Sequence, residues 1–293
     1  MKRAIPALPL TAALLLSPTV SAQPKSNDIY VSVVDGKGDP ATNLSAADFR
    51  VREDGVAREV LKVAPATEPL TVAFLVDDSQ VTTSAVQMLR EGAENFVKAL
   101  SGKADISLQT FGDRPTIVVE YTNDPQKLLD GVHRIFPRAG AGAYLMEAIV
   151  EASHGLEKRE AARPLIVVLM IDRDVEFSNQ YYDNVLKAID KAHASLHVVS
   201  LGQPNQNLTD ENRNRNQVIA IGTERTGGRR DNVISLTAAG MKMKQLADEL
   251  LHQYVVTYAR PERLIPPEKV EVTVTKPDLT ARARTRTGEA GAR

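Results

Sequence analysis

An apolar run that ends in acidic side chains constrains this chain more than any other feature of its sequence. Residues 70–76 are almost entirely apolar, and Asp77, Asp78 and Ser79 follow without a spacer. Such a run is typical of a strand buried on both faces of a parallel sheet, and side chains at its carboxyl end reach the crevice where α/β proteins bind ligands. We therefore predict an α/β fold with a functional site around Asp77.

Strand and helix patterns alternate after this run, which predicts a doubly wound, mostly parallel sheet of the Rossmann type. The predicted strands are 106–111, 116–121, 165–171, 196–201 and 233–236, with 116–121 as an antiparallel edge strand. The predicted helices are 82–100, 125–135, 144–156, 179–193 and 238–252. Gln203 to Asn216 contains Pro, Asn and charged residues, and we predict a mobile surface loop there.

Short segments with period-two alternation flank the α/β region at both ends of the chain. They lie at 29–34, 49–52 and 59–63 on one side, and at 254–258, 270–275 and 280–287 on the other. Three short strands do not make a stable sheet by themselves. We therefore predict one small β domain formed by the N-terminal and C-terminal segments together.

The first residues are typical of a signal peptide. Lys2 and Arg3 precede a short apolar region, and a small-residue pattern ends at Ala22. The apolar region is short and contains three prolines, so it is a poor membrane span, and no later segment is apolar enough to cross a bilayer. We expect an exported protein, periplasmic or secreted, whose mature chain begins at Gln23.

Composition excludes several classes of site. The chain has no Cys, which excludes disulfides and thiolate zinc sites. It carries 36 Lys and Arg against 37 Asp and Glu, so no global attraction to nucleic acid is expected. Arg282, Arg284 and Arg286 alternate along a predicted strand. They form either a face that binds a polyanion or anionic lipid or, as we favour, an ordinary solvated strand face.

The acidic loop resembles the first loop of the metal-ion-dependent adhesion site in von Willebrand factor A domains, Asp-x-Ser-x-Ser. Asp77 and Ser79 match this pattern, whereas Val81 stands where the second Ser is expected. In the later loops, Ala143 stands at a Thr position, and Asp172 is kept but is followed by Arg173 in place of Gly. The resemblance implies a degenerate site with three ligand positions left.

The resemblance extends to an exported, acidobacterial-type bacterial group of VWFA-related proteins. It rests on the landmarks 48–55, 226–229 and 252–258. The predicted organisation is a signal peptide at 1–22, the N-terminal part of the β domain at 23–67, a von Willebrand factor A-like domain at 68–253, and the C-terminal part of the β domain at 254–293.

The resemblance implies that Mg²⁺, if it binds at all, is held weakly by Asp77, Ser79 and Asp172. Mg²⁺ requires near-octahedral oxygen ligands, and the two lost hydroxyls reduce their number. Alternatively, the Arg173 guanidinium or a neighbouring one neutralises the carboxylates in a metal-free site, or the carboxylates only cap helices and bind loop amides. Further residues expected at a partner-binding surface are Asp78, Thr82, Ala143, Tyr144, Arg173 and Asp174.

We favour a protein-interaction module of adhesion or scaffold type whose loops bind an unidentified protein partner. The chain shows no Gly-x-Ser-x-Gly motif, and no His lies in a recognisable base motif, so no catalytic residues are predicted. The first alternative is a metal-dependent hydrolase that uses the Asp cluster. The second is a structural envelope component without a discrete ligand. The sequence leaves the partner and the oligomeric state open.

Overall fold

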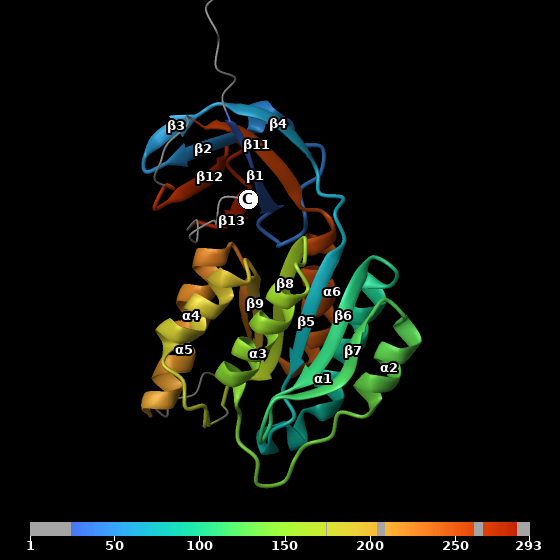
Figure 1. Ribbon diagram of the computed structural model, residues 1–293. Helices are drawn as coiled ribbons and strands as arrows, with labels where there is room; N and C mark the ends of the chain where they lie inside the picture. The colour runs from blue at the N-terminus through green and yellow to red at the C-terminus, as the bar shows by residue number, and fades with distance from the viewer. Residues whose placement is uncertain (1–24, 174, 204–208, 261–265, 286–293) are drawn as a thin grey trace, which may run out of the picture.

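The computed structural model describes residues 25–173, 175–203, 209–260 and 266–285. The chain forms a larger α/β part and a smaller β part that lies at one end of it (Figure 1). The predicted signal peptide at 1–22 and Asp174 fall outside the described residues.

A six-stranded sheet runs through the α/β part in the order β10-β9-β8-β5-β6-β7. Neighbouring strands are parallel except β7, which pairs antiparallel with β6. The strands are β5 (Leu70–Val76), β6 (Ala104–Thr110), β7 (Thr116–Thr122), β8 (Arg163–Ile171), β9 (Ser195–Leu201) and β10 (Arg230–Val233). After β5, the chain first adds β6 and β7 on one side of that strand, and then adds β8, β9 and β10 on the other side. The predicted doubly wound, mostly parallel sheet with an antiparallel edge strand is confirmed.

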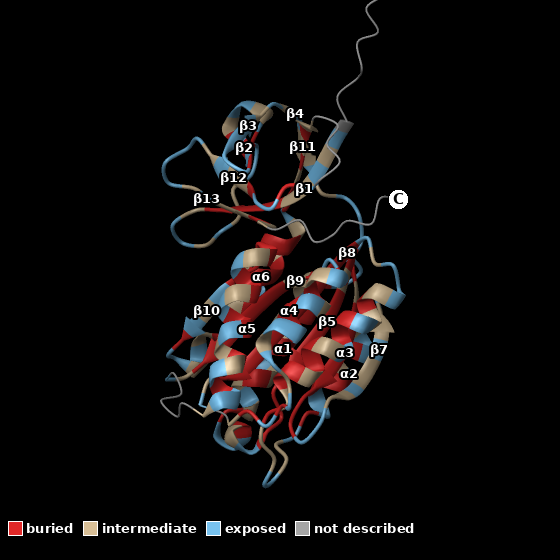
Figure 2. Ribbon diagram, turned by 60° about the vertical axis from the view of Figure 1, so that its left-hand side comes forward, coloured by how far each residue is buried: buried red, intermediate tan, exposed pale blue. Residues whose placement is uncertain are grey.

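Helices cover both faces of this sheet and turn their buried sides toward it (Figure 2). One face carries α1 (Val86–Leu100), α2 (Pro125–His133) and α6 (Ala239–Leu251), and the other carries α3 (Leu145–Lys158), α4 (Tyr182–Lys191) and α5 (Asp210–Thr226). Short 3₁₀ helices are η1 (Ala46–Asp48), η2 (Gln80–Ser84) and η3 (Leu236–Ala238). In the described residues, no helix combines the length and the apolar character that a membrane crossing requires.

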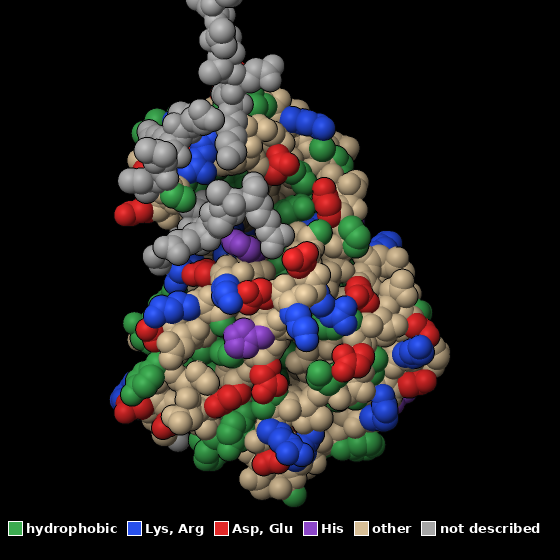
Figure 3. Space-filling view, in the orientation of Figure 1, with side chains coloured by type: hydrophobic (Ala, Val, Ile, Leu, Met, Phe, Trp, Pro, Cys, Tyr) green, Lys and Arg blue, Asp and Glu red, His purple; other side chains and the backbone are tan. Residues whose placement is uncertain are grey.

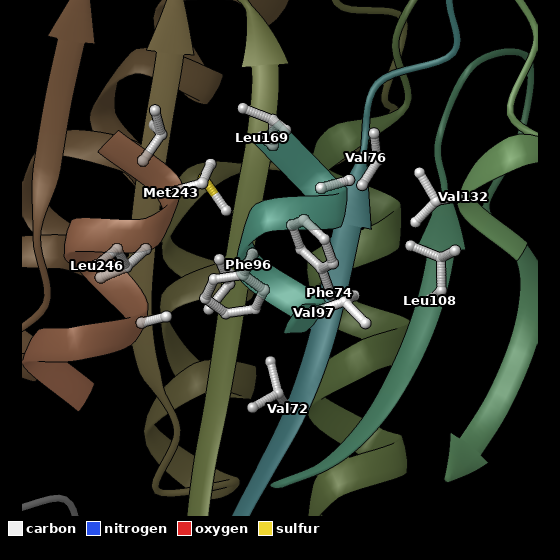
Figure 4. Close-up of a cluster of buried hydrophobic side chains, with 14 of the residues drawn as sticks. Val72, Phe74, Val76, Phe96, Val97, Leu108, Val132, Leu169, Met243 and Leu246 are labelled. Atoms are coloured by element: carbon white, nitrogen blue, oxygen red, sulfur yellow. The ribbon is translucent and has the colours of Figure 1, made fainter. Parts of the chain in front are cut away.

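Strand β5 is buried on both faces, as its apolar sequence predicts. Successive side chains of a strand point to opposite faces, and here Phe74 belongs to the core on the α1 side while Ala73 and Leu75 belong to the core on the α3 side. The Phe74 and Phe96 rings lie 4.8 Å apart between centroids, at the centre of the first core (Figure 4). Truncating such a side chain to Ala typically costs about 3–5 kcal/mol.

Two antiparallel sheets form the β part, in the orders β13-β1-β11-β4 and β12-β2-β3. Their strands are β1 (Lys25–Val34), β2 (Phe49–Glu53), β3 (Val56–Arg58), β4 (Val60–Pro65), β11 (Tyr254–Arg260), β12 (Val270–Val274) and β13 (Thr280–Ala283). Each sheet contains segments from both ends of the chain. The predicted small β domain formed by the N-terminal and C-terminal segments is therefore confirmed.

The β part contacts the α/β part where β8 and β9 begin, and we call this contact the seam. Gln253 Nε2 donates to Ser32 Oγ at 3.0 Å, and Arg282 Nη2 lies 2.6 Å from Glu249 Oε2. Arg284 Nη1 also crosses the seam, at 3.3 Å from Asp190 Oδ1. The predicted solvated strand face is therefore wrong for these two arginines, because acidic side chains of the α/β part pair with both. Arg286 is outside the described residues.

The predicted surface loop from Gln203 to Asn216 is also wrong in its second half, because α5 begins at Asp210. The Thr209 side chain caps this helix by accepting a hydrogen bond from the Asn212 amide at 3.2 Å. The buried side of α5 includes polar side chains, Asn212 and Arg215 among them. The apolar period that normally predicts a helix is therefore missing from the sequence.

Candidate functional site

The carboxyl ends of β5, β6 and β8 meet at the edge of the sheet that lies opposite the β part (Figure 1). We call the segments 77–84, 111–115, 134–144 and 172–181 at this edge the crest loops. Strand order reverses between β5 and β8, so this edge contains the topological switch point at which open α/β sheets usually bind ligands. Asp77 directly follows one of these strands, and Asp172 directly follows the other.

Asp77 holds the two central strands together at the crest. It is fully buried, its Oδ1 accepts a hydrogen bond from the Ser79 amide at 2.9 Å, and its Oδ2 accepts one from the Ile171 amide at 3.1 Å. The Asp77 amide itself donates to Leu169 O at 3.0 Å. Both carboxylate oxygens are therefore committed to backbone amides of β8 and of its own loop.

Asp78 joins three crest loops. Its Oδ1 accepts a hydrogen bond from the Gly112 amide at 2.6 Å, and its Oδ2 pairs with Arg138 Nε at 2.8 Å. The loops pack so closely that a Cβ on Gly112 would lie 2.7 Å from Asp78 Oδ1, a contact that only glycine avoids. Sequence reasoning missed Arg138, because nothing in its surroundings marks it as the partner of an acid sixty residues away.

Ser79 and Thr82 lie in the same loop, and both are fully buried. Thr82 Oγ1 donates to Ser79 O at 2.7 Å, which fixes the turn into α1. Ser79 Oγ makes no hydrogen bond within the described chain. One hydroxyl at this loop is therefore uncommitted.

Ala143, at the position where the resemblance leads one to expect Thr, lies fully buried between two other crest loops. It forms an antiparallel bridge with Gly112 and a parallel bridge with Glu176. The Phe177 amide donates to Ala143 O at 2.8 Å, and the Tyr144 amide donates to Phe111 O at 2.8 Å. These bonds close the crest loops over the end of the sheet.

Asp172 turns toward α5 and β10. Its Oδ2 accepts a hydrogen bond from Asn232 Nδ2 at 2.7 Å, and its Oδ1 lies 3.8 Å from Arg215 Nη2. Burial raises the pKa of Asp172, although Arg215 and Arg230 partly oppose this shift. Arg173 is exposed. The guanidinium that approaches Asp172 therefore belongs to the buried Arg215, on α5.

Glu176 is a buried acidic group that sequence reasoning did not single out. Burial raises its pKa to about 7, against the opposing effects of Ser178 and Arg215. Its Oε1 accepts a weak hydrogen bond from the Ser178 amide at 3.3 Å, while its Oε2 has no hydrogen-bond partner. Its own amide donates to Asn212 Oδ1 at 2.9 Å, which connects this crest loop to α5.

These residues do not fit a Mg²⁺ site. The orphaned Ser79 Oγ is suited to a cation, but the Asp77 carboxylate already binds two amides and the Asp172 carboxylate faces Asn232 and Arg215. Mg²⁺ requires about six oxygen ligands in near-octahedral geometry. Among the described residues, no group of three or more His, Cys, Asp or Glu side chains is placed to hold a metal ion.

Aromatic side chains lie on the outside of the crest loops. Phe177 is 54% exposed and stacks against Tyr144, with ring centroids 6.2 Å apart and an interplanar angle of 25°. Its ring occupies the space beside Gly142, where an added Cβ would lie 2.0 Å from it. Tyr181 is 71% exposed and Phe136 is 62% exposed. We call Phe136, Phe177 and Tyr181 the crest aromatics.

Charged side chains of both signs lie on the surface of the α/β part (Figure 3). On the face drawn in Figure 3, which carries α3, α4 and α5, basic and acidic side chains are interspersed. No single-sign patch dominates that face.

Comparisons with known proteins agree with this architecture. Residues 72–174 match the family model described as von Willebrand factor type A domain. A solved structure described as von Willebrand factor type A from Catenulispora acidiphila is similar with a TM-score of 0.52 and 9% identity, over 91% of this chain and 72% of that one. Proximal thread matrix protein 1 from the mussel byssus has a TM-score of 0.50 and 12% identity, over 69% of this chain and 50% of that one.

A further similar structure is a conserved hypothetical protein, BatB from Bacteroides thetaiotaomicron. It has a TM-score of 0.48 and 16% identity, over 62% of this chain and 98% of that one. A search of curated proteins gave no match. Identities this low show the fold alone. Residues 72–174 thus match the von Willebrand factor type A family model, and the larger part of the chain has that fold.

Proposed function

We propose that this protein is an interaction module that binds a protein partner through its crest loops. The observation that carries the proposal is the exposure of Phe177 and Tyr181 on a loop whose backbone is held by the buried side chains of Glu176 and Asn212. Exposed apolar patches on monomeric proteins often mark interaction sites, and aromatic residues are enriched among the residues that contribute most to binding at protein interfaces. The fold supports the same conclusion only by analogy.

The way the crest acids are bonded supports binding over catalysis. Asp77 and Asp78 have their oxygens engaged by backbone amides or by Arg138, so neither is positioned to activate a water molecule. A metal-dependent hydrolase would need an open coordination position and ligands around it. The alternative reading as a hydrolase therefore has less support than the interaction module.

We further propose that the crest works without a metal. Arg138 balances the charge of Asp78, and Arg215 approaches Asp172, so two guanidinium groups offset negative charge at the crest without a divalent cation. The crest would then present a preorganised surface at any Mg²⁺ concentration. Preorganised loops lose less conformational entropy on binding.

We also propose that the protein is exported and that its parts have the bounds 1–22, 23–67, 68–253 and 254–293. We infer that residues 1–22 are removed and that the mature protein is periplasmic or secreted, as in the acidobacterial-type group that its landmarks resemble. Mass spectrometry of the protein from its own envelope should find Gln23 at the amino terminus. An intact Met1 on cytosolic protein would overturn this inference.

The test of the interaction module is crosslinking of the full chain in its own cell envelope, with and without chelator. The double variant Phe177→Ala, Tyr181→Ala should lose the crosslinked partner that the wild type captures. Leu61→Ala provides the matched control, since Leu61 is 45% exposed on β4, in the β part at the opposite end from the crest loops. Equal capture by both variants would favour the structural-component reading, and turnover of a substrate that stops with chelator would favour the hydrolase.

A further inference from the structure

A pocket of about 370 Å³ lies at the seam, on the opposite end of the α/β part from the crest loops. We call it the seam pocket. Tyr30 of β1, Arg163 at the start of β8, Ser195 at the start of β9 and Arg284 after β13 all line it. Four segments of the chain therefore converge on one cavity, which has the size of a site for a small organic molecule, about 300–1,000 Å³.

Arg163 is the unusual group in this pocket. It is only 5% exposed, and its hydrogen bonds go to neutral oxygens: Glu68 O at 2.9 Å, Leu250 O at 3.0 Å and Gln253 Oε1 at 2.7 Å. Its Nε is buried without an acceptor. Among the described residues, no carboxylate oxygen lies within the 4.0 Å of Arg163 that defines an ion pair, and the exposed Glu68 carboxylate, which interacts with Tyr30, acts on Arg163 only from beyond that distance.

A buried guanidinium without a counter-ion is costly. Removing an ionised group from water costs several kcal/mol unless a partner compensates it, and for this reason Arg and Lys are almost never fully buried unless paired. The other buried or half-buried arginines at the seam follow this rule, since Arg229 and Arg282 pair with Glu249 and Arg284 pairs with Asp190. Arg163 departs from the rule at the place where the seam pocket opens beside it.

The rest of the lining is consistent with an anionic ligand. Arg163 Cζ lies 5.2 Å from the centroid of the Tyr30 ring, which holds the guanidinium plane in place. Arg284 contributes a second positive charge and shares its partner Asp190 with Arg225. Asp28 is the acidic side chain among the lining residues that the structure describes, and its Oδ1 already accepts a hydrogen bond from Thr257 Oγ1.

We propose that the seam pocket binds a small organic anion whose carboxylate or phosphate group lies against Arg163, with Arg284 as the second cation. A carboxylate group and a phosphate group each offer a pair of oxygens that a guanidinium group can bind with two parallel hydrogen bonds. The bound anion would connect β1, β8 and β13, so it would stabilise the contact between the β part and the α/β part. This site is independent of the crest loops and of the partner proposed for them.

The test is isothermal titration calorimetry of the full chain at constant ionic strength. The probes are benzoate, inorganic phosphate and the neutral benzamide. We expect saturable binding of one molecule of benzoate or phosphate per chain in the millimolar range or tighter, and no binding of benzamide. The two anions decide between a carboxylate and a phosphate ligand. Absence of saturable binding for both anions, or equal binding of benzamide, overturns the proposal.

Variants locate the binding. Arg163→Gln should weaken anion binding by at least about tenfold, because a charge-assisted hydrogen bond is lost. Arg163 also holds Leu250 O, so Arg284→Gln provides a second variant that leaves those bonds intact and should weaken binding about threefold. Arg282→Gln is the matched control: it removes another seam ion pair on the same segment but does not line this pocket. Weakening of the same size in Arg282→Gln and Arg284→Gln overturns the assignment to the seam pocket.

Discussion

Arg138 Nε donates to Asp78 Oδ2 at 2.8 Å, although the two residues are sixty positions apart in the sequence. The Asp78 side chain is 5% exposed and that of Arg138 is 35% exposed. The Arg138 amide also donates to Asp78 O at 2.8 Å. This pair therefore connects the crest loop 134–144, between α2 and α3, to the crest loop 77–84 at the end of β5.

Breaking this pair should destabilise the protein. Arg138→Gln leaves a buried carboxylate without its counter-ion, and we expect a loss of about 1–3 kcal/mol in the free energy of unfolding. Asp78→Asn keeps an acceptor for the Gly112 amide, so a double-mutant cycle with Arg138→Gln isolates the charge interaction. Urea denaturation measures both quantities. Lys187→Gln, which removes an exposed pair with Asp183, should change stability by less than about 0.5 kcal/mol.

Zero coupling energy in that cycle would mean that the Asp78 and Arg138 side chains do not act as a pair. The crest loops would then be held by their backbone hydrogen bonds alone.

The parts of the site that sequence reasoning predicted lie directly after buried strands. Asp77 and Asp172 could be placed because strand periodicity fixes where a strand ends, and parallel strands end at one edge. Arg138, Glu176 and Arg215 could not be placed in this way. Each acts through a partner that only the tertiary fold brings near, and Arg215 lies on a helix whose buried side has no apolar period. The β part was predictable because short strands need partners. Its seam contacts were not predictable, because they join residues that are far apart in the sequence.

Stability should depend on pH through Glu176. Its folded pKa of about 7 lies above that of an unfolded Glu, so between about pH 4.5 and 7 the folded state binds more protons than the unfolded state. The free energy of unfolding should therefore fall as pH rises through this window, by at most on the order of 3 kcal/mol. Urea denaturation from pH 5 to pH 8 measures this fall.

Glu176→Gln should remove most of that dependence, because Gln stays neutral and can keep the hydrogen bond from the Ser178 amide. A wild type and a variant with the same pH profile would show that Glu176 titrates normally and that its loop opens to water.

The position of the Phe177 ring should depend on the absence of a side chain at Gly142. Gly142→Ala places a Cβ where the Phe177 ring lies, so Phe177 must leave Tyr144 and the partner surface changes. We expect a loss of about 1–3 kcal/mol in stability from overpacking, together with loss of partner crosslinking. Gly155→Ala is the matched control: nothing lies within 4 Å of its added Cβ, and Ala in a helix should stabilise by about 0.5–1 kcal/mol. Unchanged crosslinking by Gly142→Ala would remove Phe177 from the binding surface.

The N-terminal strands should fold only when the C-terminal strands are present to pair with them. β1 pairs with β11 over seven positions and with β13 over four, so residues 23–67 alone lack the partners of their first strand. That fragment should remain unfolded, whereas residues 69–253 contain the whole six-stranded sheet and should fold. Circular dichroism and nuclear magnetic resonance of the two fragments test both expectations. A cooperative unfolding transition in the 23–67 fragment would contradict them.

Metal binding provides the last test of the crest. The wild type should show no saturable heat with millimolar Mg²⁺ or Mn²⁺ in calorimetry, because Val81 and Ala143 offer no hydroxyl and the Asp77 oxygens already bind backbone amides. Arg173→Gly alone should change nothing, since Arg173 is exposed. Adding Val81→Ser and Ala143→Thr to it restores two hydroxyl ligands and should produce measurable Mg²⁺ binding. Ala143 is fully buried between two loops, so this triple variant should also lose about 1–3 kcal/mol of stability in the absence of metal. Mg²⁺ binding by the unmodified protein that disappears in Ser79→Ala would show instead that the crest is a working metal site.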